Sequence, residues 1–286
     1  MVPTSSPIVA LSAETSVRCA LPAAPLRTWI DHYWLSLDND SPAHAILPDG
    51  AIDLVVRQGP ESDSDWTVRV YGTTTSSLSI ALEQGAHYAG VRFKPGQGRH
   101  FLKAAARELT DRCESATGLL PFCLDRVAWH VGSADIFASF DAVLLAHAAS
   151  VQPLPARIDS AVALIAASRG MLSIEDAADA FGTGRRQFER VFLDTVGIAP
   201  KLFSSIVRFH CAGRLIRQAP AARMTLADIA HACGYADQSH MNRDFRRLAG
   251  MAPSAFVRGN VAFVQDAAAP PPDNTPACST HPGEWK

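Results

Sequence analysis

The sequence contains no run of about 18 apolar residues, the length that a membrane-spanning helix requires. It also has no basic residue before Arg18, so it does not show the charged start of a secretory signal peptide. From these absences we expect a cytoplasmic protein with no membrane partner. Charge of neither sign dominates, because 26 Lys and Arg stand against 28 Asp and Glu. The 48% hydrophobic content is that of a folded globular chain, which excludes wholesale disorder.

Cysteine is sparse, with six in 286 residues and no C-x-x-C pair, so neither a zinc ribbon nor a thioredoxin-like site is indicated. His44 and His87 are too isolated to predict a metal site. Catalytic signals are missing as well. The sequence has no G-x-S-x-G and no P-loop, and neither Cys113 nor Cys123 sits in a recognised nucleophile motif, which disfavours a repair alkyltransferase. We therefore expect no metal, no cofactor and no enzymatic activity.

The small net charge hides a division of the chain. Residues 1–156 carry a formal charge of −5, residues 157–260 carry +5, and residues 261–286 carry −2. A basic segment behind an acidic one indicates two domains with different partners. We expect an N-terminal arm over residues 1–24, a first domain over 25–150 and a second over 151–260. The proline-rich stretch 261–286 is expected to be a disordered tail.

The first domain shows short strand signals separated by turns. Residues 51–57, 66–71, 78–82 and 88–93 are β-branched or alternate in polarity, which predicts a β-rich, barrel-like domain. Helices are expected between residues 100 and 148, the first of them over 101–112. The apolar residues of a second helix, over 136–148, recur at helical spacing. They predict either a core face or a dimer face, and the sequence leaves both open.

The second domain contains a degenerate internal repeat. Ser173-Ile-Glu-Asp176 matches Thr225-Leu-Ala-Asp228 at an offset of 52, and Gly197-Ile-Ala-Pro200 matches Gly250-Met-Ala-Pro253 at 53. Each copy begins with a hydroxyl residue and an acid three positions later, the signature of a helix N-terminus. A glycine at 182 or 234 ends the first helix of each copy, and a second helix follows, over about 185–196 or 238–248.

The second helix of each copy is amphipathic. Phe188 and Phe192 lie on one face of the first, with Arg186 and Arg190 on the other side, and the second copy divides in the same way. A short helix, a glycine turn and a helix with a basic outer face are typical of a helix-turn-helix, whose second helix enters the major groove. A helical repeat protein is the alternative, but it normally needs three or more units.

Residues 157–260 resemble the DNA-binding domain of AraC-type transcription regulators. The segment that shows the resemblance is DIAHACGYADQSHMNRDFRRLAGMAPSAF. The residues at the positions typical of the family are Gly234-Tyr235, Ser239-His240, Arg243, Phe245, Gly250 and Pro253. The resemblance implies an all-α domain of seven helices, with a helix from residue 200 to 217 joining two helix-turn-helix motifs. The fold class is thus α+β. Gly184 departs from the family, which usually has Ser or Thr before the first recognition helix.

The same pattern nominates the DNA-binding residues, since Arg can pair with guanine, Gln and Asn with adenine, and Glu with cytosine. The base-facing candidates are Arg185, Arg186, Gln187, Glu189, Arg190, Gln238, Ser239, His240, Asn242 and Arg243. Arg246 and Arg247, with Arg208 and Arg214, are expected to face phosphate or solvent. The alternative for some of them is a pair with Asp176, Asp194 or Asp244 inside the domain.

The acidic half resembles, more weakly, an N-terminal domain of unknown function found in many AraC-type regulators. The motifs are residues 47–54 (LPDGAIDL) and 91–96 (VRFKPG). The resemblance implies a sensing or dimerisation domain. Candidate effector-binding residues are Trp34, His44, Trp66, Tyr71, Tyr88 and Arg92. A buried Arg92 would need a carboxylate partner, for which Asp53 is a candidate.

We therefore expect a sequence-specific DNA-binding transcription regulator that is not an enzyme and is controlled by a small effector. Double-stranded DNA is its principal expected partner. RNA polymerase and a second copy of the chain are further candidates. The alternative is an effector-independent DNA-binding protein whose N-terminal domain serves only dimerisation.

Overall fold

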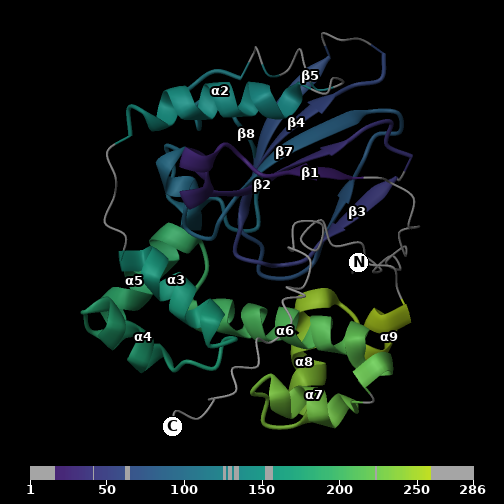
Figure 1. Cartoon of the computed structure of the whole chain (residues 1–286), viewed down its shortest axis with the longest axis vertical. Coiled ribbons are helices and arrows are strands. Elements are labelled where there is room, and N and C mark those ends of the chain that lie inside the picture. The colour runs from purple at the N-terminus through teal and green to yellow at the C-terminus, as the bar shows by residue number, and fades with distance from the viewer. Residues whose placement is uncertain are drawn as a thin grey trace, which may run out of the picture.

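The computed structural model describes residues 17–40, 42–61, 65–124, 127, 131, 135–151, 157–222 and 224–258. Within these ranges the chain forms an N-terminal lobe, built on strands, and a C-terminal lobe of helices (Figure 1). None of the helices in the described ranges combines the length and hydropathy needed to cross a bilayer. The expected tail over 261–286 and most of the expected arm lie outside the described residues, as do residues 152–156 between the lobes.

The N-terminal lobe contains an antiparallel sheet of six strands in the order β1-β2-β7-β4-β5-β8. Its strands are β1 (Arg18–Ala20), β2 (Ile30–Ser36), β4 (Ile52–Gln58), β5 (Trp66–Tyr71), β7 (His87–Phe93) and β8 (Cys113–Ser115). A separate pair is formed by β3 (Ala43–Ile46) and β6 (Leu78–Ala81). The α+β class is confirmed, but the sheet is open, with β1 and β8 at its two edges, rather than closed into a barrel.

The two faces of the sheet differ because side chains alternate along each strand. One face carries most of the apolar core and includes Leu54, Val70 and Val91, all inaccessible to solvent. Helix α2 (Ile136–Ala148) covers this face (Figure 1), and its buried residues Ile136, Phe140 and Leu144 join the same core. The apolar face of the helix over 136–148, for which the sequence allowed either a core role or a dimer role, therefore packs in the core.

Two details of the N-terminal lobe differ from expectation. Residues 101–112 do not form an α-helix, but contain the 3-10 turn η3 (Ala106–Glu108), which follows η2 (Gly98–His100). Phe101 and Leu109 are buried from this irregular segment, so their helix-like spacing reflects tertiary packing. The other difference is at the N-terminus, where β1 pairs with β2 and places residues 18–20 in the sheet rather than in an arm.

The C-terminal lobe has seven helices within residues 157–258, as expected. They are α3 (Arg157–Ala167), α4 (Ile174–Phe181), α5 (Arg185–Val196), α6 (Pro200–Ala222), α7 (Leu226–Ala232), α8 (Gln238–Ala249) and α9 (Pro253–Arg258). The pairs α4–α5 and α7–α8 are the two copies of the repeat, and the long helix α6 connects them (Figure 1).

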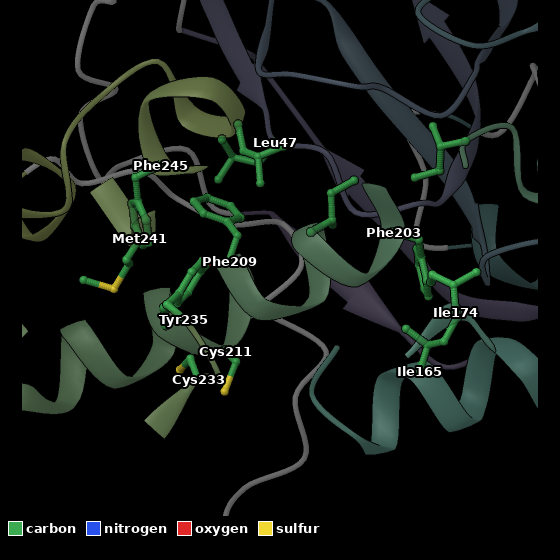
Figure 2. Close-up of a cluster of buried hydrophobic side chains, with 14 of the residues drawn as sticks. Leu47, Ile165, Ile174, Phe203, Phe209, Cys211, Cys233, Tyr235, Met241 and Phe245 are labelled. Atoms are coloured by element: carbon green, nitrogen blue, oxygen red, sulfur yellow. The ribbon is translucent and has the colours of Figure 1, made fainter. Parts of the chain in front are cut away.

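A single hydrophobic cluster runs through this lobe. Phe188 and Phe192 enter it from α5. Met241 and Phe245 enter it from α8, and both are labelled in Figure 2. Helix α6 links the two, since Phe203 packs against Phe192 at a ring distance of 5.6 Å and Phe209 packs against Phe245 at 4.8 Å. Both helix pairs are therefore held to α6 by aromatic contacts.

Candidate nucleic-acid interface and sensing face

Local hydrogen bonds fix the start of the first helix in each pair. Ser173 accepts a hydrogen bond from the Asp176 backbone at 3.0 Å, and Thr225 accepts one from Asp228 at 3.2 Å. The Asp228 carboxylate also accepts from the Thr225 backbone, which completes a capping box. Hydrogen bonds from Thr225 lower the pKa of Asp228. The motif residues predicted to begin these helices do so.

The second helix of each pair begins differently. Asp237 caps α8, because its carboxylate accepts a hydrogen bond from the His240 backbone at 2.6 Å. At the equivalent place before α5, Gly184 provides no side-chain cap. Asp237 was missed in the sequence, although an Asp directly before a helical pattern is a recognisable signal. Of the helices α5 and α8, only α8 therefore begins with a side-chain cap, as expected from the glycine at position 184.

The outer face of α5 is basic but internally paired. Arg185 donates to Glu189 at 2.9 Å and also pairs with Glu175 of α4. Arg190 donates to the side-chain oxygen of Gln187 at 2.6 Å. Arg185, Gln187 and Arg190 are exposed, and so is Arg186, which has no partner among the described residues.

The outer face of α8 carries less internal pairing. Gln238, Ser239, Arg243 and Arg246 are exposed, and neither Arg243 nor Arg246 has a partner in the described part of the chain. His240 is half-buried and packs edge-on against the Tyr235 ring at 5.2 Å. Asn242 is also half-buried, with its Oδ1 atom buried and without a hydrogen-bond partner among the described residues.

Two arginines expected at phosphate or solvent have partners inside the lobe. Arg208 donates to the Gly170 carbonyl oxygen at 2.6 Å and lies over the Tyr235 ring at 5.7 Å. Arg208 is half-buried, and its side chain braces the lobe through these contacts. Arg247 pairs with the largely buried Asp244 at 2.8 Å but stays about half exposed.

The second face of the main sheet, which we call the polar face, brings together residues nominated as effector contacts. Trp34, Tyr71, Tyr88 and Arg92, together with Asp53, share this side of four neighbouring strands, as the strand registers show. The Trp34 ring lies over Gly90. A Cβ atom at this position would come within 2.2 Å of the ring. Trp34 also donates to Asp53 at 3.3 Å.

Arg92 lies at the centre of the polar face. Its guanidinium donates to both oxygens of Asp53, at 3.1 and 2.7 Å, and to Asp49 at 2.5 Å. Burial lowers the pKa of Arg92, but the Asp49 and Asp53 carboxylates outweigh this effect and raise it. The predicted Arg92–Asp53 pair is confirmed, and Asp49 is a second partner.

The remaining nominated residues divide between the two faces. Burial lowers the pKa of His44, and the charges of Arg92 and Asp53 also act on it, which places this β3 residue beside the polar face. Trp66 lies on the opposite face and packs against the apolar core, so it is not part of the same site. Within the described residues, no group of three or more His, Cys, Asp or Glu side chains is arranged to hold a metal ion.

The lobes also meet through residues that sequence reasoning missed. Thr73 donates to the Val196 carbonyl oxygen at 2.8 Å, and Thr110 donates to that of Gly197 at 2.5 Å. At the start of α3, Asp159 accepts from Arg99 at 2.9 Å. These partners are 60 or more residues apart in sequence, so no local pattern could have indicated them.

Comparison with known proteins assigns families to two parts of the chain. A domain of unknown function, DUF6597, matches residues 18–115, and a helix-turn-helix domain matches residues 177–259. The HTH-type transcriptional activator RhaS of Escherichia coli is 30% identical over 88 residues, which cover 31% of this chain and 31% of RhaS. The alignment thus spans about a third of the length of the curated relatives that it matches.

The comparison with solved structures gives partial matches of low TM-score. An AraC-type regulator from Chromobacterium violaceum shares 27% identity with a TM-score of 0.33, over 36% of this chain and 89% of its own. ToxT from Vibrio cholerae shares 10% identity with a TM-score of 0.44, over 85% of this chain and 98% of its own. Given the family matches and the RhaS alignment, the C-terminal lobe is a helix-turn-helix domain of the AraC type and follows a DUF6597 domain.

Proposed function

We propose that the chain is a sequence-specific DNA-binding transcription regulator in which α5 and α8 are the reading helices. The observation that carries the proposal is the pair of helix-turn-helix units joined by α6, each with exposed arginines on its second helix. An exposed guanidinium can donate two hydrogen bonds to guanine O6 and N7 in the major groove. The +5 charge of residues 157–260 adds attraction to phosphate.

The two helices are proposed to contribute unequally. In α8, Arg243 has no partner within the described ranges and the helix start is capped by Asp237. In α5, Arg185 and Arg190 must exchange their contacts with Glu189 and Gln187 for contacts with bases. Breaking those contacts reduces the net gain on binding. We therefore assign the larger share of base discrimination to α8.

The N-terminal domain is proposed to bind a small effector on the polar face. Trp34 and Tyr71 offer ring surfaces there, and Arg92, Asp53 and His44 offer polar groups. A few polar groups among aromatic rings are typical of small-molecule sites. In the alternative function, this domain binds no effector and serves only dimerisation.

Selection of binding sites from random duplex DNA with the full chain tests the DNA-binding proposal. We expect a recurring sequence bound at least about 10³-fold more tightly than random DNA at physiological salt. Recovery of no recurring sequence would contradict it. For the effector, we expect one compound in a screen by thermal melting to stabilise the full chain, by about 2.7 kcal/mol at 100 times its Kd. If no compound does so while DNA binding holds, the effector-independent alternative is favoured.

A further inference from the structure

Residues 47–50, here called the docking loop, lie between β3 and β4 and contact α6 of the other lobe. Leu47 belongs to the hydrophobic cluster of the C-terminal lobe, together with Phe209 and Phe245 (Figure 2). The carbonyl oxygen of Pro48 lies 2.7 Å from Nε2 of His210. The docking loop therefore belongs to the N-terminal lobe by sequence and partly to the C-terminal lobe by packing.

Gly50 brings the loop close to α6. Its φ of +81° is in the left-handed region, and a Cβ atom there would lie 2.7 Å from the Phe203 ring. Both requirements exclude a larger residue without rearrangement. The loop consequently touches α6 at two places, near Phe203 and at His210.

The other end of the docking loop is held by the polar face. Asp49 accepts a hydrogen bond from the Ala51 backbone at 2.8 Å, which shapes the turn, and its second oxygen binds Arg92 at 2.5 Å. Asp53 accepts two further hydrogen bonds from Arg92. Because Asp53 belongs to β4, Asp49 is the partner that joins Arg92 to the docking loop.

The contacts on α6 lie next to those that hold the reading helices. Phe203 packs on Phe192 of α5, while Phe209, adjacent to His210, packs on Phe245 of α8. A shift of the docking loop would therefore act on both helix pairs through one rigid helix. Charge-assisted bonds in a partly buried site are strong, so exchanging one of them can bias such a packed arrangement.

We propose that the docking loop is a coupling element that transmits changes at Arg92 to α6, and so sets how α5 and α8 are presented to DNA. In this role Asp49 and Arg92 are positioning residues that do not touch DNA. The effects on DNA presentation and on effector response rest on the proposed function. The mechanical link between Arg92 and α6 does not depend on DNA.

Hydrogen–deuterium exchange of the full chain without DNA tests the link, comparing Asp49→Asn with a matched Asp65→Asn control. Asp65 is an exposed carboxylate of the N-terminal lobe that pairs with Arg57 at 3.3 Å. We expect Asp49→Asn to speed exchange of α6 amides by about tenfold and Asp65→Asn to leave them unchanged. Faster exchange confined to β4 and β7 in Asp49→Asn would overturn the proposal.

A second variant covers the case in which Asp49→Asn does not fold. Gly50→Ala leaves the Asp49–Arg92 pair in place and strains the contact with Phe203, so it too should speed α6 exchange by about tenfold. Unchanged α6 exchange in this variant would also overturn the link. Titration of wild type on selected and random duplexes reports separately on the proposed function, and its failure would not affect the exchange result.

Discussion

Thr73, which follows β5 in the N-terminal lobe, donates a 2.8 Å hydrogen bond to the carbonyl oxygen of Val196 at the end of α5. Thr73 is fully buried and Val196 nearly so. Thr110 repeats the contact one residue later at Gly197, whose φ of +92° ends the helix. The C-terminus of the first reading helix is therefore fixed to the N-terminal domain by two hydroxyl groups.

Thr73→Val should lower the free energy of unfolding by about 1–3 kcal/mol, because it leaves the buried Val196 carbonyl without its donor. Urea denaturation of the full chain measures this loss. The matched control is Thr75→Val, whose hydroxyl bonds Asp111 within the same lobe at an exposed site and should cost less. Equal losses in the two variants would show that the Thr73 bond makes no special contribution.

Helix capping provides a second prediction. Asp237→Ala should destabilise the full chain by about 1 kcal/mol, since it removes the acceptor for the His240 backbone. Gly184→Ser should stabilise it by a few tenths of a kcal/mol, because Gly184 has extended φ and ψ and nothing lies within 4 Å of a Cβ atom there. Thermal denaturation of both variants checks the opposite signs. A destabilised Gly184→Ser would mean that α5 begins elsewhere in solution.

Base discrimination should depend more on Arg243 than on Arg190. Each alanine substitution is expected to weaken the binding free energy on the selected site by about 1–3 kcal/mol if the arginine donates two hydrogen bonds to guanine. Arg190 also gives up its 2.6 Å bond to Gln187 on binding, so its net contribution should be smaller. Titrations on selected and random duplexes measure the difference. A larger loss of specificity in Arg190→Ala would reverse the assignment of the two helices.

Arg246→Ala is the control for these titrations. As an exposed residue with no partner in the described ranges, Arg246 is expected to contact phosphate. Its loss should weaken binding to all sequences alike and reduce the salt slope by about one unit. Arg247 suits this control less well because Asp244 already holds it.

Stability should fall on acidification through His100, at the junction of the lobes. Burial, followed by the charge of Arg99, lowers the pKa of His100 from its usual 6.5 to about 4. His100 therefore takes up a proton near pH 6.5 in the unfolded chain, but only near pH 4 in the folded chain. Protonation favours the unfolded chain between these two values, so the free energy of unfolding falls as the pH drops from 6.5 to about 4. His100→Gln should flatten the decline in denaturation midpoint over that window. The exposed His231→Gln is the control, and an unaltered slope in His100→Gln would contradict the assignment.

The helix-turn-helix units could be predicted because their signals are local. Ser173 and Gly182 delimit α4, and Thr225 begins α7, each by bonds or backbone angles spanning a few residues. The Arg92–Asp53 pair was also predictable, since a charge in an apolar strand needs a partner. The irregular segment 101–112 was not, because packing of Phe101 under the sheet overrides its helical pattern. Contacts between lobes, such as His210 with Pro48, join positions 162 residues apart and leave no pattern in the sequence.

The central claim is that one chain reads DNA with both α5 and α8. Hydroxyl-radical footprinting of the full chain on its selected duplex tests this claim most directly. The account predicts two protected segments about 10 base pairs apart on one face of the duplex, since the two helices would enter successive major-groove segments. Scrambling either segment should remove its own protection and weaken binding. A single protected segment, or protection that survives scrambling of one segment unchanged, would contradict the account.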